Sequence, residues 1–207
     1  MRFMTLALTA PFRRLLALAA LVAASLSLAG CGAINRVPTL EEQAKARWSE
    51  VQNQYQRRAD LIPNLVETVK GFARQEEKVL TEVVEARANA TKVTIDASKL
   101  TDPEAVKRFQ EAQQQLSGAL GRLLAVSENY PDLKSNQNFL ALQSQLEGTE
   151  NRIAVARRDY IAAVQAYNTE LRTFPGRWIA SWLYPEAKPM ATFETAQENQ
   201  APPKVTF

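Results

Sequence analysis

The feature that constrains this chain most is a stripe of apolar residues at helical spacing between Leu40 and Ala73. Its members are separated mostly by steps of four, four and three residues, which place them on one face of a nearly straight α-helix. The stripe consists of Leu40, Ala44, Trp48, Val51, Tyr55, Ala59, Ile62, Val66, Val69 and Ala73. Such a face is typical of a helix packed into a core.

The apolar pattern continues beyond residue 73, so the sequence predicts a first helix over residues 39–90 that begins at an N-cap, Thr39. Pro63 lies in the middle of this helix. A proline has no amide hydrogen and its ring presses on the preceding turn, which leaves the Ala59 carbonyl without its helical partner. The helix can therefore kink at Pro63 or break in two. We expect a kink, because the stripe keeps its phase across the proline.

Two further helices are predicted, over residues 103–129 and 135–172. The first follows a cap at Asp102 and ends before Pro131. The second carries apolar residues seven apart, which is the seam of a coiled coil: Phe139, Leu146, Ile153, Tyr160, Tyr167 and Phe174. No strand is predicted. We therefore expect an all-α, elongated antiparallel up-and-down helical bundle over residues 39–174, with the long first helix kinked near Pro63.

The chain after the bundle is predicted to form a short aromatic helix over residues 175–184 and a flexible, proline-rich tail over residues 185–207. Three aromatic residues of the short helix, Trp178, Trp182 and Tyr184, have two interpretations. They could cap the end of the bundle, or they could form a contact with a membrane interface, where tryptophan and tyrosine are enriched.

The front of the chain has the layout of a secretory signal. Basic residues and an apolar run over residues 15–28 precede the only cysteine, Cys31. The motif Leu28-Ala29-Gly30-Cys31 resembles the lipobox of bacterial lipoproteins. The resemblance implies removal of residues 1–30 by cleavage between Gly30 and Cys31, a diacylglycerol on the cysteine sulfur and an acylated amino terminus, for example with palmitate. The alternative is an uncleaved signal anchor with an incidental cysteine.

A lipidated Cys31 would hold the protein on a membrane through a short tether, residues 31–38. The residue after the cysteine is Gly32 and not the aspartate associated with inner-membrane retention in enteric bacteria. The sequence therefore favours a lipid-anchored protein of the bacterial cell envelope, on the outer membrane and facing the periplasm if the cell has two membranes.

The composition excludes several classes of function. The chain has no histidine and one cysteine, which excludes Ser/His/Asp and Cys/His nucleophiles, thiolate or imidazole zinc sites and internal disulfides. Without residues 1–30, 22 basic residues face 22 acidic ones, so no net field attracts nucleic acid. The glutamates are predicted to form a solvated helix face: Glu76, Glu77, Glu82 and Glu85. We expect no metal, cofactor or nucleic-acid partner.

A polar cluster around Pro63 is the best candidate for a functional site. It consists of Arg57, Arg58, Asp60 and Asn64, of which Asp60 and Asn64 share a helix face. The cluster could bind a partner at the kink. In the structural interpretation, one of the arginines forms an ion pair across the bundle and Asn64 satisfies the backbone group freed by Pro63.

The run R-R-A-D-L-I-P-N-L-V-E-T-V-K at residues 57–70 resembles the LemA family of bacterial envelope proteins. Further matches are Glu76 or Glu77, Leu171-x-x-Phe174-Pro175, Lys188-Pro189 and Phe193. The resemblance covers residues 34–193 and implies an up-and-down helical bundle held at a membrane, with no established enzymatic activity. Some family members are tied to magnetosome membranes, and others are encoded beside membrane metalloproteases. This chain carries a lipobox where many members have a plain transmembrane segment.

These observations together predict a non-catalytic, lipid-anchored helical scaffold or adaptor that binds other envelope proteins through a helix face, with a membrane protease among the candidate partners. One alternative is an enzyme or ligand-binding protein that uses carboxylates on cell-wall material. Another alternative is a membrane-remodelling protein that acts through the aromatic helix.

Overall fold

The computed structural model describes Leu18 and residues 32–193. The predicted signal segment, apart from Leu18, and the predicted lipidation site Cys31 lie outside the described residues, and so do residues 194–207 of the predicted tail. Cleavage between Gly30 and Cys31 and lipidation of Cys31 therefore stay predictions.

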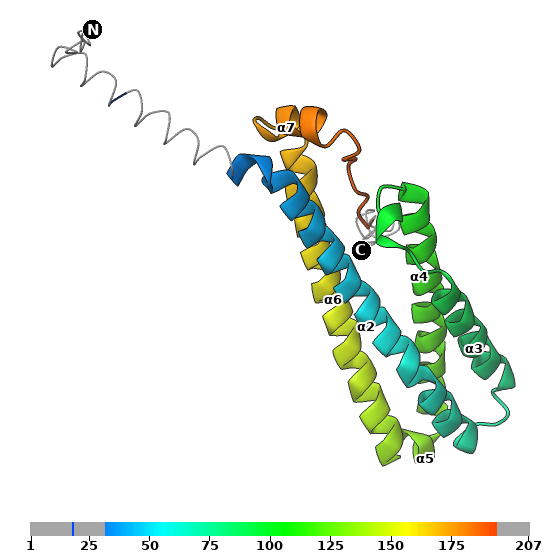
Figure 1. Cartoon of the computed structure of the whole chain (residues 1–207). Helices are drawn as coiled ribbons and strands as arrows, with labels where there is room; N and C mark the ends of the chain where they lie inside the picture. The colour runs from blue at the N-terminus through cyan, green and yellow to red at the C-terminus, as the bar shows by residue number, and fades with distance from the viewer. Residues whose placement is uncertain (1–17, 19–31, 194–207) are drawn as a thin grey trace, which may run out of the picture.

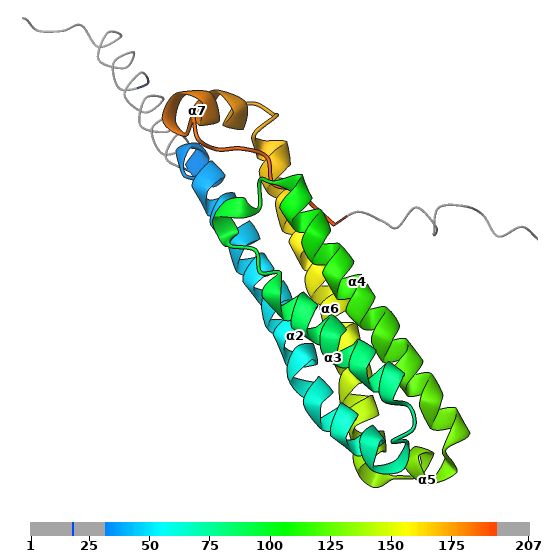
Figure 2. The same ribbon diagram turned by 90° about the vertical axis from the view of Figure 1, so that its right-hand side faces the viewer.

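The described part of the chain is a bundle of four long helices that run alternately up and down (Figures 1 and 2). They are α2 (Arg36–Phe72), α3 (Glu77–Lys92), α4 (Pro103–Val126) and α6 (Gln137–Glu170). The shorter elements are η1 (Ala97–Lys99), η2 (Ser127–Asn129), α5 (Pro131–Lys134) and α7 (Gly176–Leu183). Residues 32–193 contain no strand. The predicted all-α antiparallel bundle is confirmed.

The predicted single helix over residues 39–90 is wrong, because residues 73–76 form a turn between α2 and α3. Ala73 leaves the helical conformation, with φ −129° and ψ 53°, and the chain reverses direction. The apolar pattern gave no sign of this turn because both helices bury their apolar faces in the same core, among them Val69 of α2 and Leu80 and Val83 of α3. The spacing of apolar residues therefore continues across the reversal.

Helix α2 spans 37 residues and continues through Pro63, so the alternative of a break at the proline is wrong. The helix also begins at Arg36, three residues before the predicted cap at Thr39. Residues 32–34 are helical as well, so the described part of the predicted tether is not an extended linker. At about 1.5 Å per residue, α2 is about 55 Å long and sets the length of the bundle.

The predicted starts of the other helices are close to the observed ones because their caps are local. The side chain of Asp102 accepts a hydrogen bond from the Glu104 amide at 3.0 Å, and Pro103 occupies the first turn of α4. Helix α4 and η2 together span the predicted residues 103–129. The side chain of Asn136 caps α6 by accepting from the Asn138 and Phe139 amides.

The buried apolar side chains form two clusters, one toward each end of the bundle. The α7-end core contains a group of aromatic rings whose centroids lie 5.2–5.8 Å apart: Trp48, Tyr55, Phe109, Tyr160 and Phe193. The α5-end core is mostly aliphatic and includes Ile62, Leu65, Val69, Leu116, Leu123 and Leu146. Members of the predicted heptad seam of α6 enter both cores.

The first part of the predicted flexible tail is docked on the bundle, which corrects the prediction for residues 185–193. Met190 and Phe193 are buried in the α7-end core. The Met190 amide donates to Asn168 Oδ1 at 2.9 Å, and Tyr160 Oη donates to the Ala191 carbonyl at 2.8 Å. The proline-rich composition indicated disorder, but two apolar side chains and a few backbone hydrogen bonds hold this segment in place.

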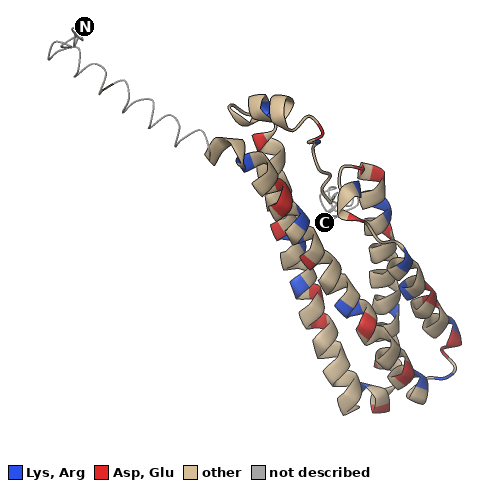
Figure 3. Ribbon diagram, in the orientation of Figure 1, with Lys and Arg blue, Asp and Glu red and all other residues tan. Residues whose placement is uncertain are grey.

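Basic and acidic residues are interspersed along the bundle (Figure 3). Several of them pair on the surface, as in the contact between Lys45 Nζ and Glu41 Oε1 at 2.8 Å. Lys45 also pairs with Glu42. Hydrogen bonds to the carboxylate of Glu41, and secondly to that of Glu42, raise the pKa of Lys45. The charge distribution thus agrees with the balanced composition of residues 31–207.

Replacing Phe193 by alanine is expected to destabilise the bundle by about 3 kcal/mol, because the ring contacts Trp48 and Tyr160 in the core. Urea unfolding followed by circular dichroism measures this loss. Phe174→Ala is the matched control, since that ring is 72% exposed, and it should change the free energy of unfolding by less than about 0.5 kcal/mol. Equal effects of the two substitutions would show that the Phe193 ring does not contribute to the core.

Candidate functional site

Arg58 is the one member of the predicted polar cluster whose side chain enters the bundle, where it is 1% exposed. Its Nη1 atom donates to Ser117 Oγ at 2.8 Å and to Glu150 Oε1 at 2.9 Å. Its Nη2 atom donates to Gln113 Oε1 at 2.6 Å and to the Gln113 carbonyl at 3.2 Å. The guanidinium carbon lies 4.9 Å from the centroid of the Tyr55 ring. Arg58 therefore forms the ion pair across the bundle that the structural interpretation predicted.

This polar layer connects all four long helices. Arg58 belongs to α2, Gln113 and Ser117 to α4, and Glu150 to α6, while Gln113 Nε2 donates to the Ala90 carbonyl of α3 at 3.3 Å. Along the bundle, the layer lies between the last residues of the α7-end core and the first of the α5-end core. Within the described residues, Arg58 Nε is the one buried side-chain nitrogen or oxygen atom without a hydrogen-bond partner.

The other three members of the cluster, Arg57, Asp60 and Asn64, are exposed on the outer face of α2. Asp60 Oδ1 accepts a hydrogen bond from Gln56 Nε2 at 2.7 Å. The structure thus divides the predicted cluster into a buried arginine that holds helices together and an exposed polar face available to a partner.

The carbonyl freed by Pro63 has a partner that the sequence did not indicate. Arg87 of α3 donates from Nε to the Ala59 carbonyl at 2.8 Å. Asn64 does not satisfy this carbonyl; its own carbonyl accepts from Thr68 Oγ1. In a single helix over residues 39–90, even one kinked at Pro63, Arg87 would lie many turns from Ala59; the chain reversal at residues 73–76 brings the two together.

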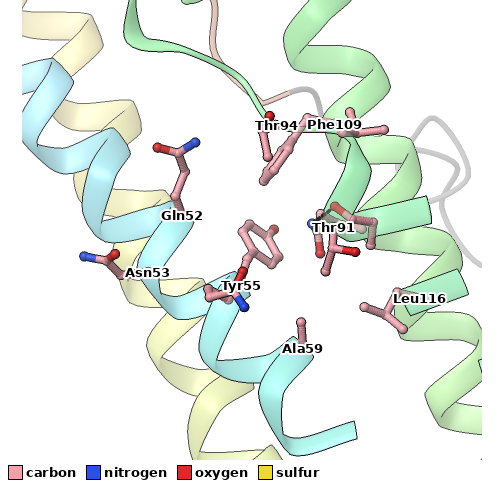
Figure 4. Close-up of a pocket in the computed structure, with 12 residues that line it drawn as sticks. Gln52, Asn53, Tyr55, Ala59, Thr91, Thr94, Phe109 and Leu116 are labelled. Atoms are coloured by element: carbon pink, nitrogen blue, oxygen red, sulfur yellow. Dashed lines mark hydrogen bonds between the residues drawn. The ribbon is translucent and has the colours of Figure 1, made fainter. Parts of the chain in front are cut away.

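A pocket of about 290 Å³ opens between α2, α3 and α4, next to the Arg58 layer (Figure 4). We call it the Tyr55 pocket. It is lined by Gln52, Asn53, Tyr55, Gln56, Ala59, Ala90, Thr91, Val93, Thr94, Phe109, Gln113 and Leu116. The lining combines amide and hydroxyl groups with two aromatic rings, those of Tyr55 and Phe109, which pack edge to face. No lining residue carries an ionised group, so the pocket offers hydrogen bonds and aromatic contacts and no carboxylate pair.

The polar groups of the pocket come from segments distant in sequence. Gln52 Nε2 donates to the Ile95 carbonyl at 2.9 Å, which holds the segment after α3 against α2. Burial raises the pKa of Tyr55, an effect that the charges of Arg157 and Arg58 partly oppose. Tyr55 is therefore a neutral hydroxyl at physiological pH. In the sequence, Gln52, Thr91 and Thr94 belong to no motif and to no regular spacing of polar residues, so nothing indicates that they line a pocket.

The structure separates the three predicted interface residues of the aromatic helix. Trp178 and Trp182 are 73% and 89% exposed, whereas Tyr184 is half-buried against the α7-end core. The two tryptophans therefore do not cap the bundle. Together with Ile34, Ile179, Ser181 and Leu183 they line an apolar hollow at the surface of about 570 Å³.

The described glutamates do not form a metal site. Among residues 32–193, no group of three acidic side chains is placed to hold a metal ion. Glu76 instead accepts a hydrogen bond from Tyr130 Oη, and Glu82 pairs with Arg122 at 3.1 Å.

None of the helices in the described part of the chain has an apolar stretch long enough to span a bilayer.

The fold and its sites define an all-α antiparallel bundle with a buried arginine layer, a polar pocket and an exposed aromatic helix. A family model described as the LemA family matches residues 47–207, and the chain belongs to this family. The resemblance stated from the sequence is thereby confirmed.

Among its relatives is magnetosome protein MamQ 2 of Paramagnetospirillum magneticum, which is 28% identical over 166 residues, 70% of this chain and 60% of the relative. Magnetosome protein MamQ of Magnetospirillum gryphiswaldense is 27% identical with the same coverage. Protein LemA of Metamycoplasma hominis is 23% identical over 135 residues, 65% of this chain and 58% of the relative. The chain thus spans about three fifths of the length of these relatives.

Removing the Arg58 side chain is expected to destabilise the protein strongly. Arg58→Ala leaves the Gln113 and Ser117 oxygens without their donor and deprives Glu150 of its counter-ion, which should lower the free energy of unfolding by about 3 kcal/mol. Arg57→Ala, at the exposed neighbouring position, should change it by less than about 0.5 kcal/mol. Urea unfolding of the two variants measures both values. Similar stability of the two variants would contradict the structural role of the Arg58 layer.

Proposed function

We propose that this LemA-family protein is a non-catalytic, lipid-anchored adaptor of the bacterial cell envelope. In this proposal a segment of another envelope protein binds in the Tyr55 pocket and along the adjoining exposed face of α2. The observation that carries the proposal is the lining of the pocket, which is rich in uncharged hydrogen-bonding groups and has aromatic walls. Amide and hydroxyl side chains of this kind pair with peptide groups, and aromatic rings pack against apolar side chains.

The exposed polar cluster extends this binding surface. Gln56 lies at the rim of the pocket and donates to Asp60, and Asn64 lies one helical turn further along α2. Exposed Arg57 is adjacent and adds a positive charge. A peptide that leaves the pocket along α2 would meet these groups in turn, which fits the predicted binding of partners through a helix face.

Two observations favour a binding protein over the alternative of a carboxylate enzyme acting on cell-wall material. An enzyme of that class needs two acids facing each other across a cleft, and the lining of the Tyr55 pocket contains neither aspartate nor glutamate. The names of the relatives, magnetosome protein and protein LemA, also describe no enzyme.

The anchor and the location are part of the same proposal. The lipobox at residues 28–31 supports attachment through lipid on Cys31, and the glycine that follows favours the outer membrane, facing the periplasm, in a cell with two membranes. A membrane protease is one candidate partner. Membrane remodelling remains the second alternative, for which the exposed tryptophans of α7 are the supporting observation.

A photo-crosslinking amino acid identifies what occupies the pocket in cells. With benzoylphenylalanine in place of Asn53, at the pocket rim, irradiation should give a discrete crosslinked product that mass spectrometry identifies as an envelope protein. The matched control replaces Ser144, which is exposed on α6 and does not line the pocket. Equal products from both positions, or no product from position 53, would contradict the proposed binding surface.

Lipidation has a direct test in the intact mass of the protein from its own membranes. The wild-type chain should begin at Cys31 and carry the added mass of its acyl groups, whereas Cys31→Ser should accumulate with residues 1–30 attached and without lipid. A Cys31→Ser variant that is still cleaved and acylated would overturn the anchor.

A further inference from the structure

We propose that α7, with Phe174 and Ile34 beside it, is a second membrane contact that seats the end of the bundle in the bilayer interface. This inference rests on the proposed function in one respect, the attachment of the chain to a membrane through residues that precede Gly32. The occupant of the surface is the headgroup and upper acyl region of a phospholipid bilayer.

The first observation is the exposure of large aromatic rings at regular spacing. Phe174, Trp178 and Trp182 lie four residues apart, and their side chains are 72%, 73% and 89% exposed. The Phe174 and Trp178 rings contact each other, with centroids 6.3 Å apart. Tryptophan is enriched at membrane interfaces because its ring has a large apolar face and a polar N–H.

These residues form part of a continuous apolar surface. Ile34, Trp178, Ile179, Trp182 and Leu183 line one hollow, which has a volume of about 570 Å³. The other large exposed apolar side chains of residues 32–193 are dispersed over α2, α3 and α6: Phe72, Val84, Leu140, Val155 and Ile161. Scattered apolar residues are ordinary on a protein surface, whereas a cluster of this size indicates a contact with another apolar phase.

The opposite face of α7 is held firmly against the bundle. Gly176 and Ala180 are buried, and a Cβ atom added at Gly176 would lie 2.3 Å from the Glu170 carbonyl oxygen. The absence of a side chain at Gly176 lets α7 approach the end of α6 this closely. Glu170 also pairs with Arg36 at the start of α2, at 2.8 Å. The face of α7 that carries the tryptophans therefore points away from the bundle, and the buried face holds the helix in place.

The position of α7 identifies the bilayer as the surface that it meets. Helix α7 lies at the end of the bundle where α2 begins, opposite the end that carries α5 (Figures 1 and 2). Ile34, two residues after Gly32, lines the same hollow as the tryptophans. Any attachment through Cys31 or through the apolar residues 15–28 reaches the bundle at this end. The membrane that holds the chain is thus the apolar phase nearest to α7.

Charge complementarity favours the same occupant. Arg172 lies two residues before Phe174, and Arg177 directly precedes Trp178. Both are exposed and have no ion-pair partner among the described residues. Arginines next to an interfacial aromatic cluster interact with the phosphate groups of phospholipids, most strongly with those of anionic lipids.

Tryptophan fluorescence of the full chain in vesicles tests the contact, because the protein has three tryptophans and Trp48 is buried in the core. The protein is reconstituted into vesicles of phosphatidylethanolamine and phosphatidylglycerol whose acyl chains carry bromine, a quencher of tryptophan emission. We expect strong quenching of the wild-type protein and protection of its emission from aqueous iodide. In the Trp178→Phe, Trp182→Phe variant, emission comes from Trp48 alone and bromine should leave it unchanged.

Emission from Trp178 and Trp182 that iodide quenches and brominated lipid does not would place α7 in water and overturn the proposal. Self-association of the chain that excludes lipid from α7 would overturn it as well. Sedimentation of the chain from residue 32, with and without Trp178→Ala and Trp182→Ala, detects this second outcome. All described core residues lie between Val37 and Phe193, so this shorter chain retains the whole core.

The same shorter chain distinguishes failure of the anchor from failure of the inference. It lacks Cys31 and any lipid, so its binding to the vesicles depends on α7. We expect it to sediment with vesicles of phosphatidylethanolamine and phosphatidylglycerol and the Trp178→Ala, Trp182→Ala variant to remain in solution. Unlipidated Cys31 in the native protein would refute the anchor alone, whereas equal sedimentation of the two shorter chains would refute the role of α7.

Discussion

The buried guanidinium of Arg58 is the interaction on which the rest of the bundle depends. Removing a charge from water is costly unless its hydrogen-bonding groups are satisfied. Both terminal nitrogens of Arg58 meet this requirement with Gln113, Ser117 and Glu150, while Nε has no partner. Gln113 in turn contacts the backbone of α3. These partners come from different helices, so their hydrogen bonds form only when the helices are aligned in one way along the axis of the bundle. The polar layer thus selects one register for apolar faces that could otherwise slide past one another.

The layer also divides the bundle into two parts of different character. On the α5 side, the core is built mainly from aliphatic side chains and ends in the turns around α5. On the α7 side, an aromatic core supports the Tyr55 pocket, the docked residues 187–193 and α7. The Tyr55 pocket and α7 lie on the α7 side or at the layer itself, and the exposed face of α2 that adjoins the pocket continues past the layer to Asn64.

Features that depend on neighbouring residues were predictable from the sequence, and features that depend on distant residues were not. Asp102 and Pro103 mark the start of α4 because a cap acts within one helical turn. Arg87 could not be assigned to the Ala59 carbonyl, because their contact requires the turn at residues 73–76. The Tyr55 pocket brings together residues from α2, α3 and α4 that share no motif. The docking of Phe193 likewise depends on contacts with Trp48 and Tyr160, which are distant in the sequence and which composition does not record.

The sequence by itself determined the all-α class, the apolar faces of the helices, the LemA-family resemblance and the absence of histidine chemistry. These properties follow from residue types and their spacing along the chain. Only the tertiary structure decided that α2 ends at Phe72, that Arg58 is buried while Arg57, Asp60 and Asn64 are exposed, and that Trp178 and Trp182 are free of the core. The physical reason is that helical periodicity specifies which face is apolar, whereas the partner of that face depends on chain reversals and on the pairing of buried polar groups.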